Sequence, residues 1–261
     1  MRRFCANLST LFLEHPPIER PAAARRAGFT GAEFQFPYDI PAQALARAAA
    51  AAGIEIVNFN APCGDRAGGE IGIACLPGRE AEFRDAIATA RAYAGALGCK
   101  RVNVLMGIVP ADVERERCLE TLARNLDRAA TEMADAGILL ITEPMNRHDR
   151  PGYCINKVGE AGAFVRAIGN RNLRLEVDVY HMAREDEAVA ETLRANIDMI
   201  GHIQFADVPG RHEPGTGSLD LAGIFDTLEG AGYTGWLSAE YNPAGRTEDG
   251  LGWLDALARG G

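Results

Sequence analysis

The 261-residue sequence predicts an α/β protein, a (β/α)8 TIM barrel folded as a single domain over residues 1–261. Short apolar runs alternate eight times with alanine-rich amphipathic stretches, and polar residues follow the last four apolar runs. Repeated β-then-α units indicate a parallel sheet, and eight of them close into a barrel. The alternative is an open doubly wound sheet, which usually carries a glycine-rich phosphate turn after its first strand. The sequence ANLST at that place offers none.

Eight strands are expected, each a short β-branched or leucine-rich run of the kind that is buried on both faces of a parallel sheet. In chain order they span residues 4–8, 31–35, 55–60, 101–106, 138–142, 173–177, 202–204 and 236–239. The alanine-rich stretches between them, with charged residues on one face, are expected to form helices. Two of these stretches end at Gly98 and Gly137, because glycine accepts the left-handed conformation that follows a last helical turn.

The longest stretch without periodicity is residues 61–78, APCGDRAGGEIGIACLPG, which follow the third expected strand. A loop of this length in a compact domain is usually functional or mobile. On a barrel it would lie at the catalytic face, so we expect it to cover the site as a lid. The alternative is an insertion without a role.

Four polar residues stand where the last four strands end: Glu143 after GILLIT, Asp178 after LRLEV, Gln204 after MIGHI and Glu240 after GWLSA. In a barrel these adjacent strand ends build one half of the active-site mouth. Three carboxylates and an amide oxygen at one point would repel each other unless a cation lay between them. An oxygen-only ligand set suits a divalent metal ion such as Mg²⁺ or Mn²⁺. Each residue alone has a blander interpretation as a cap or loop contact, but together they predict a metal-dependent enzyme.

Further polar residues are candidates for the same cavity. His181 follows Asp178 by three residues and is expected to contact substrate. Arg211 is the only arginine in DVPGRHEPGTGS, and its planar fork suits a substrate carboxylate; the alternative is a solvated surface arginine. Asn60, at a strand tip, is expected to donate a hydrogen bond to a polyol or oxoacid. His202 is expected to be a core histidine, with the acid two residues before Asp178 holding it or a ligand in place.

Composition excludes several classes of protein. The formal net charge of −9 argues against nucleic acid or an anionic membrane as partner, so an anionic substrate must meet local cations. The six cysteines form no C-x-x-C pair and predict reduced thiols in a cytoplasmic protein. The start MRRFCANLST lacks a long apolar region, and no run approaches membrane length. No G-x-S-x-G elbow or Walker loop appears, so nucleophilic hydrolysis and nucleotide chemistry lack support. The sequence leaves the oligomeric state open, with a homo-oligomer possible.

The chain resembles the hydroxypyruvate isomerase family, a branch of the xylose isomerase-like superfamily of metal-dependent isomerases, epimerases and endonuclease IV. The stretches that carry the resemblance span nearly the whole chain: FCANLSTLF, GFTGAEFQFPYD, GDRAGGEIGIACLPGREAEFRDAI, LLITEPMNRHDRPGY, VDVYHM, GHIQFADVPGRHEPGTG and GWLSAEYNP. Two positions depart from the pattern: Ser218 stands where relatives usually carry an acid, and Ile71 where some carry arginine. An endonuclease role is disfavoured, because that chemistry uses a histidine-rich zinc cluster and the five histidines here are scattered.

The resemblance implies roles for the four strand-end residues. Glu143 and Glu240 would match the paired acid/base carboxylates, and with Asp178 and Gln204 they would match the metal ligands. Gln204 replaces the histidine of ketose 3-epimerases, which favours the hydroxypyruvate isomerase branch. His181 and Arg211 would match substrate-contacting positions.

The implied reaction interconverts hydroxypyruvate and 2-hydroxy-3-oxopropanoate (tartronate semialdehyde), a step of glyoxylate metabolism, by enediol proton transfer between the two glutamates. A hydride shift between the carbons is the mechanistic alternative. The alternative activities are a 2-oxo-tetronate isomerase or a ketose 3-epimerase that uses the same metal site. A non-catalytic barrel that binds a small ligand is a third hypothesis, disfavoured because clustered carboxylates are costly to keep without chemistry.

Overall fold

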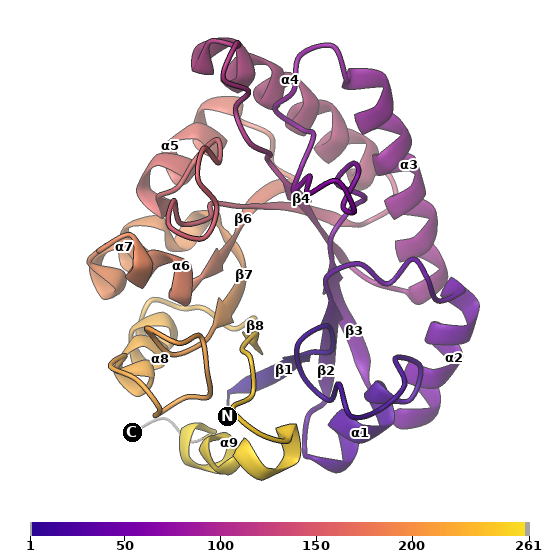
Figure 1. Ribbon diagram of the computed structural model, residues 1–261, viewed down its shortest axis with the longest axis vertical. Helices are drawn as coiled ribbons and strands as arrows, with labels where there is room; N and C mark the ends of the chain where they lie inside the picture. Colours follow the sequence, from indigo (N-terminus) through magenta and orange to yellow (C-terminus); the bar gives the residue numbers. More distant parts are fainter. Residues whose placement is uncertain (1, 259–261) are drawn as a thin grey trace.

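The structure, a computed structural model, describes residues 2–258 and contains a single eight-stranded sheet. The strands are parallel and their order is β3-β2-β1-β8-β7-β6-β5-β4, so that each strand lies beside its neighbours in the chain except across the β3–β4 seam. The helices lie outside the ring of strands (Figure 1). The predicted (β/α)8 barrel is confirmed. Residues 1 and 259–261 lie outside the described part, so the prediction of one domain over the whole chain stays a prediction.

All eight expected strands are present. They are β1 (Arg3–Asn7), β2 (Gly31–Phe34), β3 (Glu55–Phe59), β4 (Arg101–Leu105), β5 (Leu139–Glu143), β6 (Leu173–Asp178), β7 (Ile200–Phe205) and β8 (Trp236–Ala239). The expected bounds differ from these by a residue or two at most. The largest consequence concerns β5 and β6, which include Glu143 and Asp178 as their last residues. Both acids are therefore fixed by sheet hydrogen bonding rather than carried on loops.

The seam between β3 and β4 closes the barrel through asparagines rather than a full ladder. An isolated parallel bridge joins Asn60 and Asn103 just beyond the end of β3. The Asn103 Nδ2 group donates to Asn60 Oδ1 at 3.0 Å, and the Ala61 amide donates to the Asn103 carbonyl at 2.7 Å. The side chains thus supply part of the pairing that two parallel strands normally make with their backbones.

The helices follow the predicted amphipathic stretches. They are α1 (Arg20–Arg26), α2 (Ala42–Ala52), α3 (Glu80–Leu97), α4 (Arg115–Ala134), α5 (Val158–Ile168), α6 (Val179–Arg184), α7 (Val189–Asn196), α8 (Leu221–Gly230) and α9 (Gly252–Leu257). The α3 helix ends as expected, with Gly98 in the left-handed conformation at φ 69°. The α4 helix ends at Ala134, and Gly137 shortly after it adopts the expected left-handed conformation, at φ 65°.

Helix α9 packs against the outside of the barrel through one tryptophan. The Trp253 ring meets Phe4 of β1 and Phe205 of β7 edge-on, with ring centroids 5.4 Å away in each pair. Edge-to-face pairs of this kind add about 0.5–1.5 kcal/mol to the burial of the rings. Within residues 2–258, no helix is both long and apolar enough to cross a membrane.

Candidate active site

A cavity of about 460 Å³ opens at the carboxyl ends of the strands, where barrel enzymes place their active sites. It is lined by six of the residues singled out from the sequence: Asn60, Glu143, His181, Arg211, Gln204 and Glu240. The seventh, Asp178, is only 1% exposed and meets the others through Arg211 and His181. The structure therefore brings together all the residues predicted to share a site, although they come from distant parts of the chain.

The predicted ligands come from adjacent strands. In the β6–β7 register, Asp178 pairs with Gln204, so that both reach the mouth at the same height. Ligand atoms of Glu143, Asp178 and His181 all lie within 4.8 Å of one another. The His181 Nε2 atom is 3.6 Å from Glu143 Oε1 and 3.9 Å from Asp178 Oδ2. Two buried carboxylates at this spacing could share a metal ion.

Two of the predicted ligands, Gln204 and Glu143, have side-chain oxygen atoms that accept no hydrogen bond from the described residues. The Gln204 Oε1 atom is buried and accepts no hydrogen bond among the described residues. The Glu143 carboxylate, 5% exposed, likewise accepts none within residues 2–258, and its Oε1 atom is 3.6 Å from His181 Nε2. Buried polar atoms are nearly always hydrogen-bonded, and a buried carboxylate without a partner is costly. Unpartnered oxygen donors facing one cavity fit a hard divalent cation.

Arg211 bridges two of the acids. Its Nη2 atom donates to Asp178 Oδ2 and to Glu240 Oε2, each at 2.7 Å. The guanidinium lies over the Tyr180 ring, 4.7 Å from its centroid. The side chain is 23% exposed, so the interpretation as a solvated surface arginine is wrong. The sequence did not predict its bond to the two acids.

His181 is held as a neutral imidazole. The Asn146 side-chain amide donates to His181 Nδ1 at 2.6 Å, while its oxygen accepts from the His148 and Asp149 amides, which fixes the amide orientation. Burial first, and then the charges of Arg211 and a second nearby arginine, lower the pKa of His181 well below its usual value. With Nδ1 as acceptor, the ring hydrogen sits on Nε2 and points toward Glu143.

The acids disfavour one another's ionisation. Burial, and then the charges of Glu240 and Asp178, raise the pKa of Glu143 well above its ordinary value. Burial likewise raises the pKa of Asp178, against the opposing charge of Arg211. The pKa of Glu240 is raised by burial to about 7, again against Arg211. Three buried carboxyl groups cannot all be ionised without a large electrostatic cost, so the cluster favours either bound protons or a bound cation.

Protein stripped of divalent metal is expected to lose stability as pH rises from 4.5, the ordinary pKa of a glutamate, to about 7, the pKa of Glu240 in the fold. Across this window the folded protein holds a proton that the unfolded chain releases. Below pH 4.5 this group causes no loss of stability, and above about pH 7 it lowers the free energy of unfolding by on the order of 3 kcal/mol. The loss is measured from denaturation midpoints at pH 5 and pH 7.5, after the protein has been treated with chelator. The Glu240→Gln variant lacks this titration, so an equal pH dependence in both proteins contradicts the assignment.

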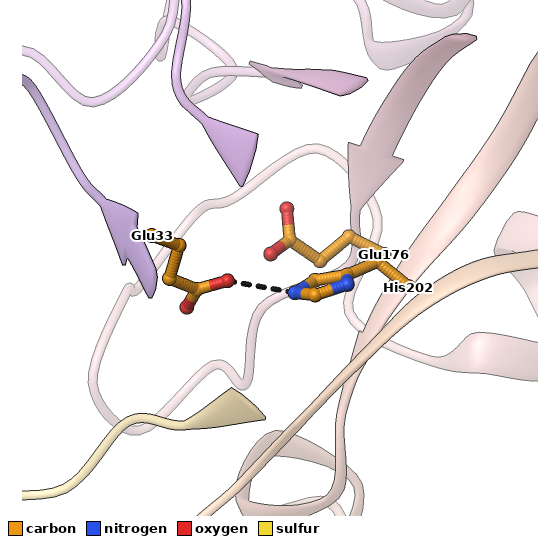
Figure 2. Close-up of side chains that lie close together, drawn as sticks. All are labelled: Glu33, Glu176 and His202. Carbon is orange, nitrogen blue, oxygen red and sulfur yellow. Dashed lines mark hydrogen bonds and ion pairs between the residues drawn. The ribbon is translucent and has the colours of Figure 1, made fainter. Parts of the chain in front are cut away.

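A second polar cluster lies deeper in the barrel, and the sequence interpretation missed its central residue. Glu33 of β2 is 1% exposed, and its Oε2 atom is 2.7 Å from His202 Nε2. Figure 2 shows its carboxylate pointing at the imidazole, with Glu176 beside the ring. Burial would raise the pKa of Glu33, but the contact with His202 and hydrogen bonds from His202 and Gln204 lower it. The one signal in the sequence is that a glutamate inside the apolar run GAEF needs polar partners, but the run does not indicate on which side of the strand they lie.

Glu176 is the acid two residues before Asp178 that was expected to hold His202 or a ligand in place, and this expectation is only partly correct. It is buried beside His202, as expected, but its Oε1 atom accepts from Asn58 Nδ2 at 3.0 Å rather than from the histidine. His202 is 0% exposed, which confirms it as a core histidine, and Glu33 is the acid that holds it.

The 61–78 loop lines the cavity, as the lid prediction requires. Arg66, Glu70 and Ile71 all face it. The loop is anchored at two points. Glu70 forms an ion pair with Arg79. Gly72, at φ 127°, lies so close to the end of β4 that a Cβ atom on it would be 2.5 Å from the Leu105 carbonyl oxygen. Whether the loop opens and closes stays a prediction.

Comparison with known proteins identifies the family of the chain. A family model described as xylose isomerase-like TIM barrel matches residues 21–257. The 2-oxo-tetronate isomerase of Cupriavidus necator is 44% identical over 97% of this chain and 98% of that protein. The hydroxypyruvate isomerase of Escherichia coli is 43% identical over 98% of this chain and 99% of that protein.

A solved structure is similar over nearly the whole length of both chains. An AP endonuclease of family 2 from Brucella melitensis is 41% identical, with a TM-score of 0.96 over 98% of this chain and 99% of that one. The family expected from the sequence motifs is thereby confirmed. The chain belongs to the xylose isomerase-like TIM barrel family, in the branch that contains the hydroxypyruvate and 2-oxo-tetronate isomerases.

Proposed function

We propose that this protein is a metal-dependent isomerase that interconverts hydroxypyruvate and 2-hydroxy-3-oxopropanoate. The observation that carries the proposal is the group of buried carboxylates and the unpartnered Gln204 oxygen at one cavity, in a chain 43% identical to a hydroxypyruvate isomerase. Glu143, Asp178, Gln204 and Glu240 would hold the metal, and their oxygen-only set suits Mg²⁺ or Mn²⁺. Such an ion, when bound, acidifies the substrate C–H bond and stabilises developing negative charge on the substrate oxygens.

The two glutamates differ in how they are held, which suits an acid and a base that exchange roles. Glu240 Oε1 accepts from Asn7 and Gln35 at 2.8 and 2.9 Å, and its Oε2 accepts from Arg211. The Glu143 carboxylate is free of such bonds and faces His181. One glutamate would take the proton from a substrate carbon and the other would return a proton to the neighbouring carbon. Burial raises the pKa of both carboxyls, that of Glu240 to about 7, and general acid–base catalysis is most efficient when the pKa lies near the operating pH.

Arg211 would bind the substrate carboxylate through its Nη1 amino group, which makes no hydrogen bond among the described residues. Its Nη2 atom is committed to Asp178 and Glu240, and its Nε atom is buried without a partner. His181 Nε2–H would contact a substrate oxygen. Asn60 lines the cavity but its Oδ1 atom is already bonded to Asn103, so only its amino group remains for substrate.

The Arg211→Lys variant is expected to lower kcat/KM for hydroxypyruvate about 10–100-fold, because a charge-assisted hydrogen bond contributes roughly 1.5–3 kcal/mol and lysine lacks the planar fork. Steady-state kinetics measure the change. Arg150→Lys is the matched control, since Arg150 lines the same cavity but, within residues 2–258, donates only to the adjacent carbonyl of Asp149. Equal losses in both variants contradict a specific role for Arg211.

A coupled assay across hydroxypyruvate, 2-oxo-tetronates and ketoses tests the proposed function. We expect the highest kcat/KM with hydroxypyruvate. A 2-oxo-tetronate isomerase is the second candidate, because the relative of that name is 44% identical to this chain. A ketose 3-epimerase would show its highest rate with a neutral sugar. A barrel that only binds a ligand would turn over none of them.

Reaction in D₂O separates the two mechanisms. Proton transfer through an enediol predicts solvent deuterium at carbon in the product, whereas a hydride shift predicts none. Exchange into recovered substrate is measured in the same experiment, because a proton returned faster than it exchanges would leave little label.

The surroundings of the protein follow from its side chains. We place it in the cytoplasm, because all six cysteines are free and buried, as expected of reduced thiols. We expect a small oxoacid as its ligand, not nucleic acid or membrane, given the net charge of −9. An endonuclease role is disfavoured because His15, His148 and His212 lie outside the lining of the cavity, which leaves no histidine-rich cluster there.

A further inference from the structure

We propose that Glu33 is a positioning residue that orients the Gln204 side-chain amide, so that the oxygen rather than the amino group faces the metal position. The inference rests on the proposed function, because it takes Gln204 as a metal ligand. Glu33 lines the cavity, but among the described residues it makes no hydrogen bond to the proposed ligand oxygens, and it acts through Gln204, whose amide it contacts.

The amide orientation follows from one hydrogen bond. The Gln204 Nε2 atom is 2.7 Å from Glu33 Oε1. An ionised carboxylate only accepts hydrogen bonds, so the amide atom that meets it must be the nitrogen. The Gln204 oxygen is then forced to the other side, where it is buried without a partner at the cavity. A glutamine free to rotate would present an amino group, which cannot bind a cation, about as easily as an oxygen.

Two further contacts hold Glu33 itself in place. Its Oε1 atom also accepts from Asn7 Nδ2 at 2.9 Å, and its Oε2 atom is 2.7 Å from His202 Nε2. In the β1–β2 register Asn7 lies beside Glu33. The same Asn7 amino group donates to Glu240 Oε1 at 2.8 Å, so Glu33 is tied to two of the proposed ligands, one directly and one through Asn7. A carboxylate held at both oxygens has little freedom to release Gln204.

Glu176 provides a matched comparison within the same cluster. It is as buried as Glu33, at 1% exposure, and lies beside the same histidine (Figure 2). Its only hydrogen bond among the described residues comes from Asn58, and it does not contact Gln204. Removing it therefore costs a buried acid and one bond, without freeing the amide that Glu33 orients.

The test measures Mn²⁺ binding to metal-free protein by electron paramagnetic resonance and calorimetry, with circular dichroism and melting temperature to verify the fold. Glu33→Met keeps the side-chain length but removes the acceptor, and we expect Mn²⁺ affinity to fall about 10–100-fold, as for other groups that orient metal ligands. Glu33→Gln keeps one acceptor oxygen, and the hydrogen bonds from Gln204 and Asn7 favour the orientation in which this oxygen faces them. It should therefore stay within a few-fold of wild type. Both variants lose the same charge, so their difference isolates the hydrogen bond.

Glu176→Met is the structural control and should bind Mn²⁺ much as the wild type does. Equal affinity in Glu33→Met and wild type overturns the inference, and so does an equal loss in Glu33→Met and Glu176→Met. An equal loss in Glu33→Gln and Glu33→Met overturns it too, because charge alone would then explain the effect. If wild type itself binds no Mn²⁺, the proposed metal centre fails instead, and the inference falls with it.

Discussion

The Glu240→Gln variant is expected to lose about 10²–10⁴-fold in kcat, the contribution that a well-placed general acid or base makes. Glutamine keeps an oxygen for the Asn7 and Gln35 donors, so the fold of the site should persist. It cannot accept or return a proton at the pH where the Glu240 carboxyl, with its pKa of about 7, exchanges one. Substrate binding should survive while turnover does not. Stopped-flow or steady-state rates with hydroxypyruvate measure kcat, and equilibrium dialysis with oxalate measures binding.

Glu70→Gln is the control for this variant. Glu70 lines the same cavity from the 61–78 loop but is paired with Arg79, so its replacement should lower kcat less than ten-fold. A Glu240→Gln enzyme with kcat within a few-fold of wild type would rule out Glu240 as the acid or base. It would also return the hydride-shift hypothesis to consideration.

Removing divalent metal is expected to lower the rate by at least about 10³-fold, since the electrostatic stabilisation of a developing enediolate is usually the largest single term. Dialysis against a chelator, followed by titration with Mg²⁺ or Mn²⁺, should restore activity with the occupancy of one site. The same titration should raise the melting temperature at pH 7.5, because a cation relieves the repulsion among Glu143, Asp178 and Glu240.

The residual metal content must be measured in the dialysed protein. Full activity in protein shown to be metal-free would contradict the metal centre. The buried acids would then act only in proton transfer. Restoration by Zn²⁺ but not by Mg²⁺ or Mn²⁺ would contradict the inference of a hard ion from an oxygen-only ligand set.

The fold and half of the site were open to prediction because they depend on local pattern. A charged or amide residue that follows a buried apolar run marks a strand end, and parallel strand ends share one face, so Glu143 and Asp178 could be placed together without coordinates. Glu33 could not be placed in the same way. It lies inside its strand, and whether such a residue faces the barrel interior or the helices depends on register, which a shift of one residue reverses.

The partners of Arg211 were beyond sequence reasoning for a different reason. Its loop has an irregular backbone, with Arg211 itself at φ 55°, and no periodicity indicates where the side chain points. The residue type correctly suggested an anion, but substrate and protein carboxylates present the same oxygen atoms. Only coordinates show that Asp178 and Glu240 are the first anions it meets.

The hydrogen bonds across the barrel interior have a consequence for how the protein matures. Glu33 and Gln204 are 171 positions apart in the chain, and Asn7 and Glu240 are 233 apart. A nascent or truncated polypeptide that lacks its final strand therefore cannot assemble a competent cation pocket, however well its earlier portion is folded. Acquisition of the ion should be among the last events after synthesis, and Mn²⁺ uptake during refolding would report completion of the ring.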